Sequence, residues 1–343
     1  MPRKFNVKLK AVLALVCLGF IFQPVSAEEV NLYSARKENL IKPLLDKFTD
    51  STGIKVNLVT GKADALLKRL ESEGVNTPAD LFITTDAGRL HRAKTADVLQ
   101  AVNSKILQEK VPANLRDPDD YWFGLSKRAR PIIYVKAKVK AGELSTYEDL
   151  ADAKWQGRIC IRSSSNIYNQ SLVASMIANS SVADTENWAK RFVSNFAVPP
   201  KGGDRDQIKA AAAGLCDIAI ANTYYLGKML HGKDEAQKNS ALKVAVFWPN
   251  QSDRGAHINV SGVAMTKHSK NINNAQKLME YLVNAESQKW YAEVNHEYPV
   301  VKGVAWSQTL ENWGKFKADE LNLSELGKLN AEAVKLMDRA GWK

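Results

Sequence analysis

Three tyrosines are the residues whose type and spacing best suit a chemical role in this sequence. Tyr224 and Tyr225 are adjacent in Ala-Asn-Thr-Tyr-Tyr-Leu-Gly, and Tyr168 lies in Ser-Asn-Ile-Tyr-Asn-Gln-Ser. Hard, highly charged cations such as Fe³⁺ prefer oxygen donors to thiolates. The charge of a bound cation favours loss of the ligand's proton, so a phenol with a pKa of about 10 can bind as phenolate at neutral pH. The alternative is that all three are half-buried aromatic residues.

Predicted strands lead directly to these tyrosines. Residues 158–161 and 216–221 have the pattern of short strands, and each is followed by a turn and a helix, the first helix over residues 169–178. Ligands of open α/β sheets bind beyond the carboxyl ends of strands. Tyr168 and the Tyr224-Tyr225 pair stand at such ends, as do Tyr33 and residues 84–86 in the first half of the chain.

The first half alternates strands and helices with short connections. Strands are predicted over 30–34, 54–59 and 79–84, and helices over 40–48 and 63–73, with Gly53 and Gly74 ending the helices. This βαβαβ order predicts an α/β fold with a parallel sheet covered by helices. The pattern recurs in the second half, and 343 residues exceed a comfortable single core, so two lobes are expected.

The first 27 residues have the pattern of an export signal. Residues 1–10 are basic, residues 11–22 form an apolar run too short to span a bilayer comfortably, and 25–27 read Val-Ser-Ala. Cleavage is predicted after Ala27. No later stretch approaches 18 apolar residues, so the exported chain is expected to be soluble.

Export changes the interpretation of the cysteines. Cleavage would remove Cys17 and leave Cys160 and Cys216, and a pair of cysteines in an oxidising compartment is a disulfide candidate. Two buried free thiols are the alternative. A metal site built from these two residues is disfavoured because neither lies in a Cys-x-x-Cys spacing.

Charge and motifs point away from nucleic acid and from known enzymes. The net charge is +11, but four of the 48 basic residues lie in the signal and no dense basic tract follows it, which favours a solvated basic surface over a nucleic-acid site. HExxH, GxSxG, the phosphate loop and the dinucleotide fingerprint are all missing. Gly202 and Gly203 are interpreted as a turn before Asp204, the predicted N-cap of a helix.

With these motifs in view, the sequence resembles the periplasmic ferric-iron-binding proteins of bacterial ABC importers, which are related to transferrin-like iron binders. The resemblance covers nearly all of the chain after the signal, and the double Tyr after Asn-Thr is its most specific part. The other motifs are Asn-Leu-Tyr-Ser-Ala-Arg at 31–36, Thr-Gly-Ile-Lys-Val at 52–56, Pro-Ala-Asp-Leu-Phe-Ile-Thr at 78–84, Ser-Lys-Arg-Ala-Arg at 126–130, Lys-Gly-Gly-Asp-Arg-Asp-Gln at 201–207, Pro-Asn-Gln at 249–251 and Arg-Gly-Ala-His-Ile-Asn at 254–259.

The resemblance implies a two-lobed, hinged type II binding protein whose metal ligands are Tyr168, Tyr224 and Tyr225. The sequence departs from close relatives in the first lobe, where they often have Ser-x-Arg-His-Tyr with His and Tyr as iron ligands. Here Lys37 and Glu38 occupy those positions. A protonated Lys cannot bind a metal. Glu38 could supply a carboxylate oxygen, or it could be the exposed first turn of a helix.

Three phenolates would leave up to three open positions on an octahedral Fe³⁺ ion. Water, carbonate or another small anion could fill them. Arg36 and Arg130 match family positions near the cleft and are expected to hold such an anion or to support the site, with structural salt bridges as the alternative. His257 is not assigned as a ligand; it is expected to order the return of the chain to the first lobe.

The resulting expectation is a monomeric periplasmic carrier, not an enzyme, that delivers Fe³⁺ to an inner-membrane ABC permease. Its first lobe would comprise 28–127 plus 256–305, and its second lobe 130–254 plus 306–343. Each lobe would contain a mixed, mainly parallel sheet flanked by helices. One alternative is a binder of a small anion clamped by Arg36 and Arg130. The other is an exported hydrolase, which would need an acid/base pair in the cleft.

Overall fold

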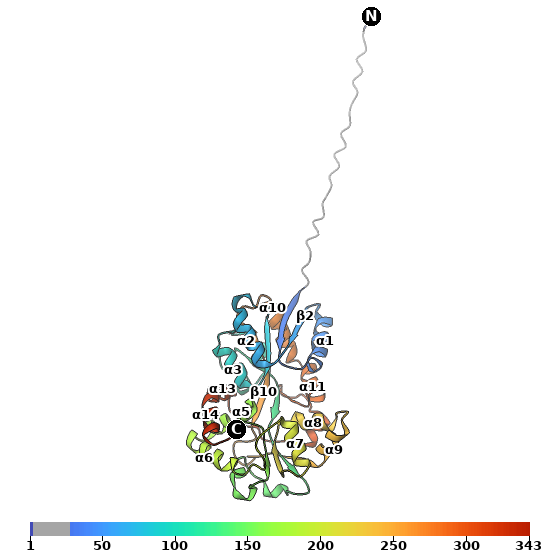
Figure 1. Cartoon of the computed structure of the whole chain (residues 1–343). Coiled ribbons are helices and arrows are strands. Elements are labelled where there is room, and N and C mark those ends of the chain that lie inside the picture. Colours follow the sequence, from blue (N-terminus) through green and yellow to red (C-terminus); the bar gives the residue numbers. More distant parts are fainter. Residues whose placement is uncertain (3–27) are drawn as a thin grey trace.

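Two β-sheets, each flanked by helices, divide the chain into two lobes that are stacked along the long axis of the molecule (Figure 1). The computed structural model describes residues 1–2 and 28–343, so the signal predicted over 1–27 lies outside the described residues except for its first two. The first lobe is defined here by the larger sheet and the second lobe by the smaller sheet. The two-lobed α/β architecture predicted from the sequence is confirmed.

The larger sheet has seven strands, with the order β11-β5-β10-β3-β1-β2 and with β4 paired to β10. All nine residues of β10 are buried, because this strand lies in the middle of the sheet. The strands are β1 (Glu29–Ser34), β2 (Lys55–Thr60), β3 (Leu81–Thr85), β4 (Leu99–Gln100), β5 (Phe123–Ala129), β10 (Ile258–Thr266) and β11 (Tyr298–Pro299).

The smaller sheet has four strands in the order β7-β8-β6-β9. They are β6 (Ile132–Val135), β7 (Ile159–Cys160), β8 (Ile218–Ile220) and β9 (Val244–Phe247). Both sheets are mixed, as expected, but among the described residues antiparallel pairs outnumber parallel ones, which are β1–β2, β1–β3 and β7–β8. The expectation of mainly parallel sheets is corrected in this respect. Most of the antiparallel pairs involve β10, which pairs with β3, β4 and β5, or β6, which pairs with β8 and β9.

Helices pack around both sheets. Those of the first lobe are α1 (Lys42–Thr52), α2 (Ala63–Glu73), α3 (Ala87–Thr95), α4 (Lys105–Lys110), α10 (Ile272–Leu282) and α11 (Ala285–Glu293). Those of the second lobe are α5 (Ile167–Asn179), α6 (Val182–Val193), α7 (Asp204–Ala212), α8 (Thr223–Leu230) and α9 (Glu235–Leu242), and the C-terminal helices are α12 (Gln308–Asn312), α13 (Ser324–Lys328) and α14 (Asn330–Arg339). Within the described part of the chain, no helix is long and apolar enough to cross a membrane.

Local sequence signals account for several helix ends. Gly53 adopts a positive φ of 74° and ends α1, as its position predicted, because the left-handed conformation costs glycine little. The Asn166 side chain accepts a hydrogen bond from the Tyr168 N–H and caps α5. Gly203, not Asp204, is the N-cap of α7, so the predicted cap is displaced by one residue and Asp204 is the first residue inside the helix.

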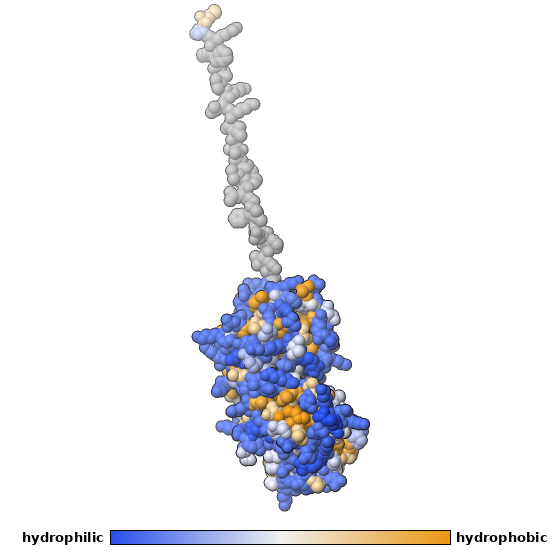
Figure 2. Space-filling model, turned by 90° about the vertical axis from the view of Figure 1, so that its left-hand side faces the viewer, coloured by the Kyte–Doolittle hydropathy of each residue, from blue (hydrophilic) through white to orange (hydrophobic). Residues whose placement is uncertain are grey.

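The lobes are joined by more than the chain segments that cross between them at 128–130 and 255–257. The Arg130 N–H donates to the His257 carbonyl at 3.1 Å, so the outgoing and returning segments lie side by side. Helix α13 packs against α3 of the first lobe and α5 of the second. The face that carries α13 and α14 is largely hydrophilic, with an apolar area at about the level of these helices (Figure 2).

A disulfide joins Cys160 of β7 to Cys216, two residues before β8, as predicted from the cysteine count. The two strands pair in parallel, with Cys160 opposite Ala219, so the bond crosses the same pair of strands that leads to the tyrosines. Both cysteines are buried among the apolar residues of the second lobe.

Reduction of this disulfide is expected to lower the free energy of unfolding by about 4 kcal/mol in the chain-entropy account, because it frees a long loop in the unfolded chain. The measurement is urea denaturation of the chain from Glu28 onward, with and without reductant. A Cys160→Ser/Cys216→Ser variant is the control and should not respond to the reductant. Two free thiols found by alkylation of the denatured, unreduced chain would contradict the bond.

Candidate metal centre

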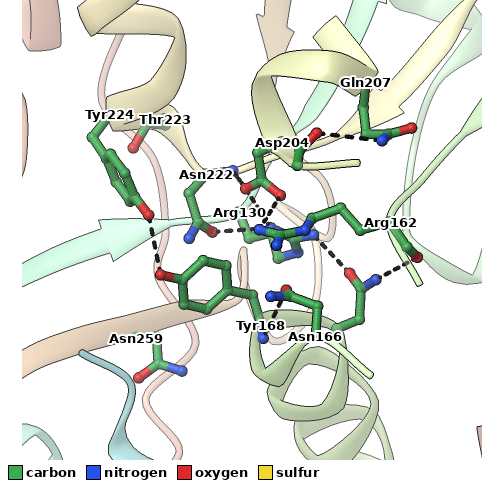
Figure 3. Close-up of polar contacts among 12 residues, drawn as sticks. Arg130, Arg162, Asn166, Tyr168, Asp204, Gln207, Asn222, Thr223, Tyr224 and Asn259 are labelled. Atoms are coloured by element: carbon green, nitrogen blue, oxygen red, sulfur yellow. Dashed lines mark hydrogen bonds and ion pairs between the residues drawn. The ribbon is translucent and has the colours of Figure 1, made fainter. Parts of the chain in front are cut away.

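The parallel pairing of β7 and β8 places the three tyrosines at one edge of the smaller sheet. Tyr168 is the second residue of α5, and Tyr224 and Tyr225 lie in the first turn of α8. The Tyr224 hydroxyl lies 3.4 Å from the Tyr168 hydroxyl (Figure 3). The rings of Tyr224 and Tyr225 are 4.3 Å apart between centroids. Both helix N-termini favour negative charge, so this edge suits phenolate oxygens.

All three tyrosines line a cavity of about 340 Å³ between the lobes. The cavity walls are strongly basic, since five cationic side chains face a single carboxylate there. The first lobe contributes Ala35, Arg36, Lys37, Asn39, Leu40, Thr85, Arg128 and Glu297, and the second contributes Tyr168, Arg205, Tyr224, Tyr225 and Lys228.

Burial keeps the tyrosine pair neutral when no cation is bound. Burial, reinforced by the neighbouring phenols, raises the pKa of Tyr225 to about 12 and raises the pKa of Tyr224 well above its usual value. Both phenols therefore retain their protons at neutral pH. A cation that binds between them must displace these protons, and binding then weakens as the pH falls.

Cationic side chains cover the faces of the tyrosine rings. The Arg128 guanidinium lies 5.1 Å from the centroid of the Tyr224 ring, and the Lys228 ammonium lies 5.3 Å from the same ring. The Arg205 guanidinium lies 5.9 Å from the Tyr225 ring. These contacts are cation–π interactions with the neutral rings, and the same charges favour the ionised form of each phenol. Burial lowers the pKa of Lys228 to about 8.

Glu297 is the one carboxylate among the described residues that line the cavity, and it anchors Arg36 and Arg128. Arg36 donates to both of its oxygens at 3.1 and 3.2 Å, Arg128 lies 3.5 Å away, and the Ser126 hydroxyl also donates to it. Burial alone would raise the pKa of Glu297, but Arg36, Arg128 and the more distant Lys228 lower it to about 2. The carboxylate is therefore ionised at neutral pH and holds Arg36 and Arg128 beside the cavity.

Of the other predicted site residues, Arg36 lines the cavity, whereas Arg130 and Glu38 do not. Arg36 lines the cavity but is engaged by Glu297 and by the Ser261 hydroxyl. Arg130 does not line the cavity; it is buried behind Tyr168 and pairs with Asp204. Glu38 begins a 3₁₀ turn (Glu38–Leu40), is exposed and does not line the cavity.

Two further residues singled out from the sequence also lie outside the cavity walls. The Tyr33 hydroxyl is directed away from the cavity and donates to Glu73. The backbone of His257 ties the returning segment to Arg130 and to the Tyr147 hydroxyl, in agreement with its expected structural role.

Sequence reasoning missed the basic residues that surround the tyrosines. Lys228 follows Tyr224 by four positions on one helix, and this spacing places both on the same face, so it could have been found. Arg128 and Arg205 lie in motifs that carried the family resemblance, but nothing local marked them as site residues. Glu297 gave no sequence signal, because its main partner Arg36 is 261 positions away.

The described residues do not form a metal site of the usual carboxylate, cysteine or histidine type. Among residues 1–2 and 28–343, no group of three or more His, Cys, Asp or Glu side chains is placed to hold a metal ion. The described residues that line the cavity include no histidine, and their one carboxylate, Glu297, is bound to two arginines. The three phenol oxygens are the group of donors that the cavity gathers for a cation, since the Glu297 carboxylate is already held by two arginines.

Comparison with known proteins defines the class to which this fold and site belong. Residues 44–318 match the family model for bacterial extracellular solute-binding proteins, and the chain belongs to that family.

Individual relatives carry more specific names. Iron uptake protein A1 of Synechocystis is 52% identical over 320 residues, which cover 93% of this chain and 89% of that protein. A Trichodesmium structure in complex with iron and citrate ligands is 54% identical, covers 92% of this chain and 100% of that one, and has a TM-score of 0.90. The ferric binding protein of Campylobacter jejuni is 43% identical with a TM-score of 0.86, over 92% of this chain and all of that one. These names describe uptake and binding proteins rather than enzymes, in agreement with the carrier expected from the sequence.

Replacing Glu297 with Gln is expected to lower the free energy of unfolding by about 3–5 kcal/mol at pH 7, because it leaves two buried guanidinium groups without a counter-charge. Chemical denaturation of the metal-free protein measures this. The Glu297 pKa is lower in the folded protein than the value of about 4.3 in the unfolded chain, so the stabilisation is present above that pH and is lost as the pH falls through about 2.

Glu293→Gln is the matched control, since Glu293 forms only an exposed pair with Lys289 at 3.7 Å. It should change the stability little. Equal stability of the Glu297→Gln variant and the wild type at pH 7 would show that Glu297 does not hold the arginines.

Proposed function

We propose that this protein binds Fe³⁺ through the phenolates of Tyr168, Tyr224 and Tyr225 and carries it to an inner-membrane ABC permease. The observation that supports this most directly is the presence of three tyrosine side chains on one interlobe cavity, with two hydroxyls 3.4 Å apart. Phenolate is a hard oxygen donor that suits a hard trivalent cation. The printed names of the relatives, iron uptake and ferric binding proteins, support the same ligand.

An exogenous anion is proposed to complete the coordination of the iron. Three phenolates balance a 3+ charge and leave up to three positions for water, carbonate or another small anion. Lys37, Arg205 and Lys228 line the cavity, and within the described residues none of them forms a salt bridge with a carboxylate. They can therefore attract an anion, whereas Arg36 and Arg130 already hold carboxylates. The citrate ligand of the Trichodesmium structure is an anion of the proposed class.

Glu38 is the least supported of the candidate iron ligands. It is exposed and begins the Glu38–Leu40 turn outside the cavity lining, so the turn would have to rearrange before its carboxylate reached the tyrosines. We therefore propose that solvent or an anion, rather than Glu38, occupies the first-lobe side of the iron.

A binder of a small anion without iron is the second candidate. The excess of cationic side chains over Glu297 in the cavity favours it. Ferric titration followed by visible spectroscopy separates the two candidates, because only bound Fe³⁺ gives a phenolate-to-iron charge-transfer band. An anion binder would stay colourless and would instead bind carbonate or citrate in the absence of metal.

The carrier is proposed to act as a monomer in the periplasm and to close about a hinge. We propose a first lobe of 28–127 plus 256–305 and a second lobe of 130–254 plus 306–343, with crossings at 128–130 and 255–257. The bonded crossing segments and the placement of cavity residues on both lobes support closure around the ligand. The family's extracellular solute-binding character supports the location outside the cytoplasm.

Tyr168→Phe, Tyr224→Phe and Tyr225→Phe should each keep the fold and weaken ferric binding by more than about 100-fold, beyond the range typical of residues that only support a metal ligand. Each substitution removes one anionic oxygen and leaves the ring. Competition titration with a ferric chelator, followed in the visible band, measures the effect. Wild-type affinity should also fall as the pH is lowered, by up to about tenfold per pH unit for each displaced proton.

Glu38→Gln is the control and should change ferric affinity little. A large loss in that variant would retain iron as the ligand but add a first-lobe carboxylate to the site. Full-strength coloured binding by the Tyr224→Phe/Tyr225→Phe double variant would remove the basis of the iron assignment.

Iron binding is expected to reduce the radius of gyration measured by small-angle X-ray scattering, because the lobes close about the crossing segments. Protease sensitivity of those segments should fall in parallel. The double Phe variant should keep the metal-free dimensions after ferric iron is added. Identical dimensions and proteolysis of the wild type with and without iron would argue against ligand-gated closure.

A further inference from the structure

A buried carboxylate behind the tyrosines connects the segments that carry them. The side chain of Asp204, the first residue of α7, is fully buried. Its Oδ2 atom accepts hydrogen bonds from the Arg130 guanidinium and from the Asn222 backbone N–H, both at 3.0 Å, and its Oδ1 atom accepts one from Arg162 at 3.3 Å (Figure 3). One carboxylate therefore joins α7 to three other segments of the second lobe.

Two of these contacts lead to the tyrosine pair. Asn222 is the N-cap residue of α8 and precedes Tyr224 by two positions. Its side chain does not cap its own helix; the Oδ1 atom accepts from Arg130 at 3.3 Å instead. Asp204 and Arg130 thus hold the backbone and the side chain of the residue at which α8 begins.

The remaining contacts lead to Tyr168. Arg130 donates to Asn169 Oδ1 at 2.6 Å, and Asn169 directly follows Tyr168. The guanidinium groups of Arg162 and Arg130 lie 5.7 and 6.0 Å from the centroid of the Tyr168 ring. The Asn169 amide donates to the Arg162 carbonyl at 2.9 Å, which closes the network around the start of α5.

The same network is attached to the crossing between the lobes. Arg130 lies between the end of β5 and the start of β6. Its N–H donates to the His257 carbonyl at 3.1 Å, and its carbonyl accepts from the Tyr147 hydroxyl at 2.8 Å. The backbone of Arg130 is therefore held at the proposed hinge while its side chain is held beneath the tyrosines.

We infer that Asp204 is a positioning residue for the metal centre, one that holds Tyr168 and Tyr224 in register through Arg130, Arg162 and Asn222. The inference rests on the proposed function of the tyrosines as iron ligands. Stability alone does not require such a residue, because buried ion pairs are often no more stabilising than apolar side chains of similar volume. Asp204 faces away from the cavity and would not touch the iron.

Asp204→Asn is the test, because it keeps the size of the side chain and removes the charge that holds the two arginines. The expected result is a loss of about 10- to 100-fold in ferric affinity and a shifted or weakened charge-transfer band, which reports phenolate geometry. Asp80→Asn is the matched control. Asp80 is an equally buried carboxylate in the first lobe that accepts from Asn31, Ser269 and Asn271. It should lower the melting temperature and leave the band and the affinity unchanged.

A crystal structure of the metal-free Asp204→Asn variant would show the positions of the tyrosines in the absence of iron. The Tyr168 and Tyr224 hydroxyls are expected to separate beyond hydrogen-bonding distance. If Asp204→Asn does not fold, Arg162→Gln replaces it in both measurements, since Arg162 is partly exposed and its loss leaves the Asp204–Arg130 pair intact. A colourless wild-type protein would overturn the proposed function. A folded variant with wild-type band, affinity and hydroxyl separation would overturn the role of Asp204 alone.

Discussion

The parallel pairing of β7 with β8 brings together two segments whose cysteines are 56 positions apart in the chain. Because the strands are parallel, their carboxyl ends meet at one edge, and the helices that follow begin side by side. Each helix has tyrosine in its first turn, so the strand pairing brings Tyr168 and Tyr224 to the same edge of the sheet. The disulfide joins the last residue of β7 to the residue two before β8, and the Asp204 carboxylate holds Arg162 and Asn222, which follow these strands.

The charges at the cavity fall into two groups with different tasks. Glu297, which lines the cavity, and Asp204, which lies outside its lining, are buried carboxylates that neutralise arginines of the first and second lobe. Lys37, Arg205 and Lys228 face the cavity without such partners in the described residues. The inner surface is therefore basic, and burial keeps the phenols of Tyr224 and Tyr225 neutral until a cation displaces their protons. This combination suits a trivalent cation that arrives with an anion, since each would compensate the other's charge.

The connection between the lobes limits how they can move. The crossing segments are hydrogen-bonded to each other, and helix α13 bridges α3 and α5 on one side of the molecule. Gly327 makes this bridge close, because a Cβ atom there would lie 2.2 Å from the Cβ atom of His91. Aromatic residues also join the lobes: the Phe316 ring stacks on the Trp248 ring, 3.9 Å apart between centroids, and contacts the Tyr298 ring of the first lobe. Closure about the proposed hinge would therefore have to keep or rearrange these packed contacts.

Local sequence determined the helix over Ala63–Glu73, the glycine end of α1, the disulfide and the placement of tyrosines after strands. Helix periodicity and helix ends depend on residues that are close in the sequence, and a disulfide can be expected from the number of cysteines. These features can therefore be recognised without a structure. The partners of Glu297 and Asp204 could not be recognised in this way. Asp204 had the sequence position of a helix cap, yet it lies inside α7 and pairs with Arg130, 74 positions away. Glu297 meets Arg128 because β11, which begins at the next residue, pairs with β5, and it meets Arg36, which follows β1 of the same sheet. Strand order brings such distant charges together, and strand order is a property of the whole fold.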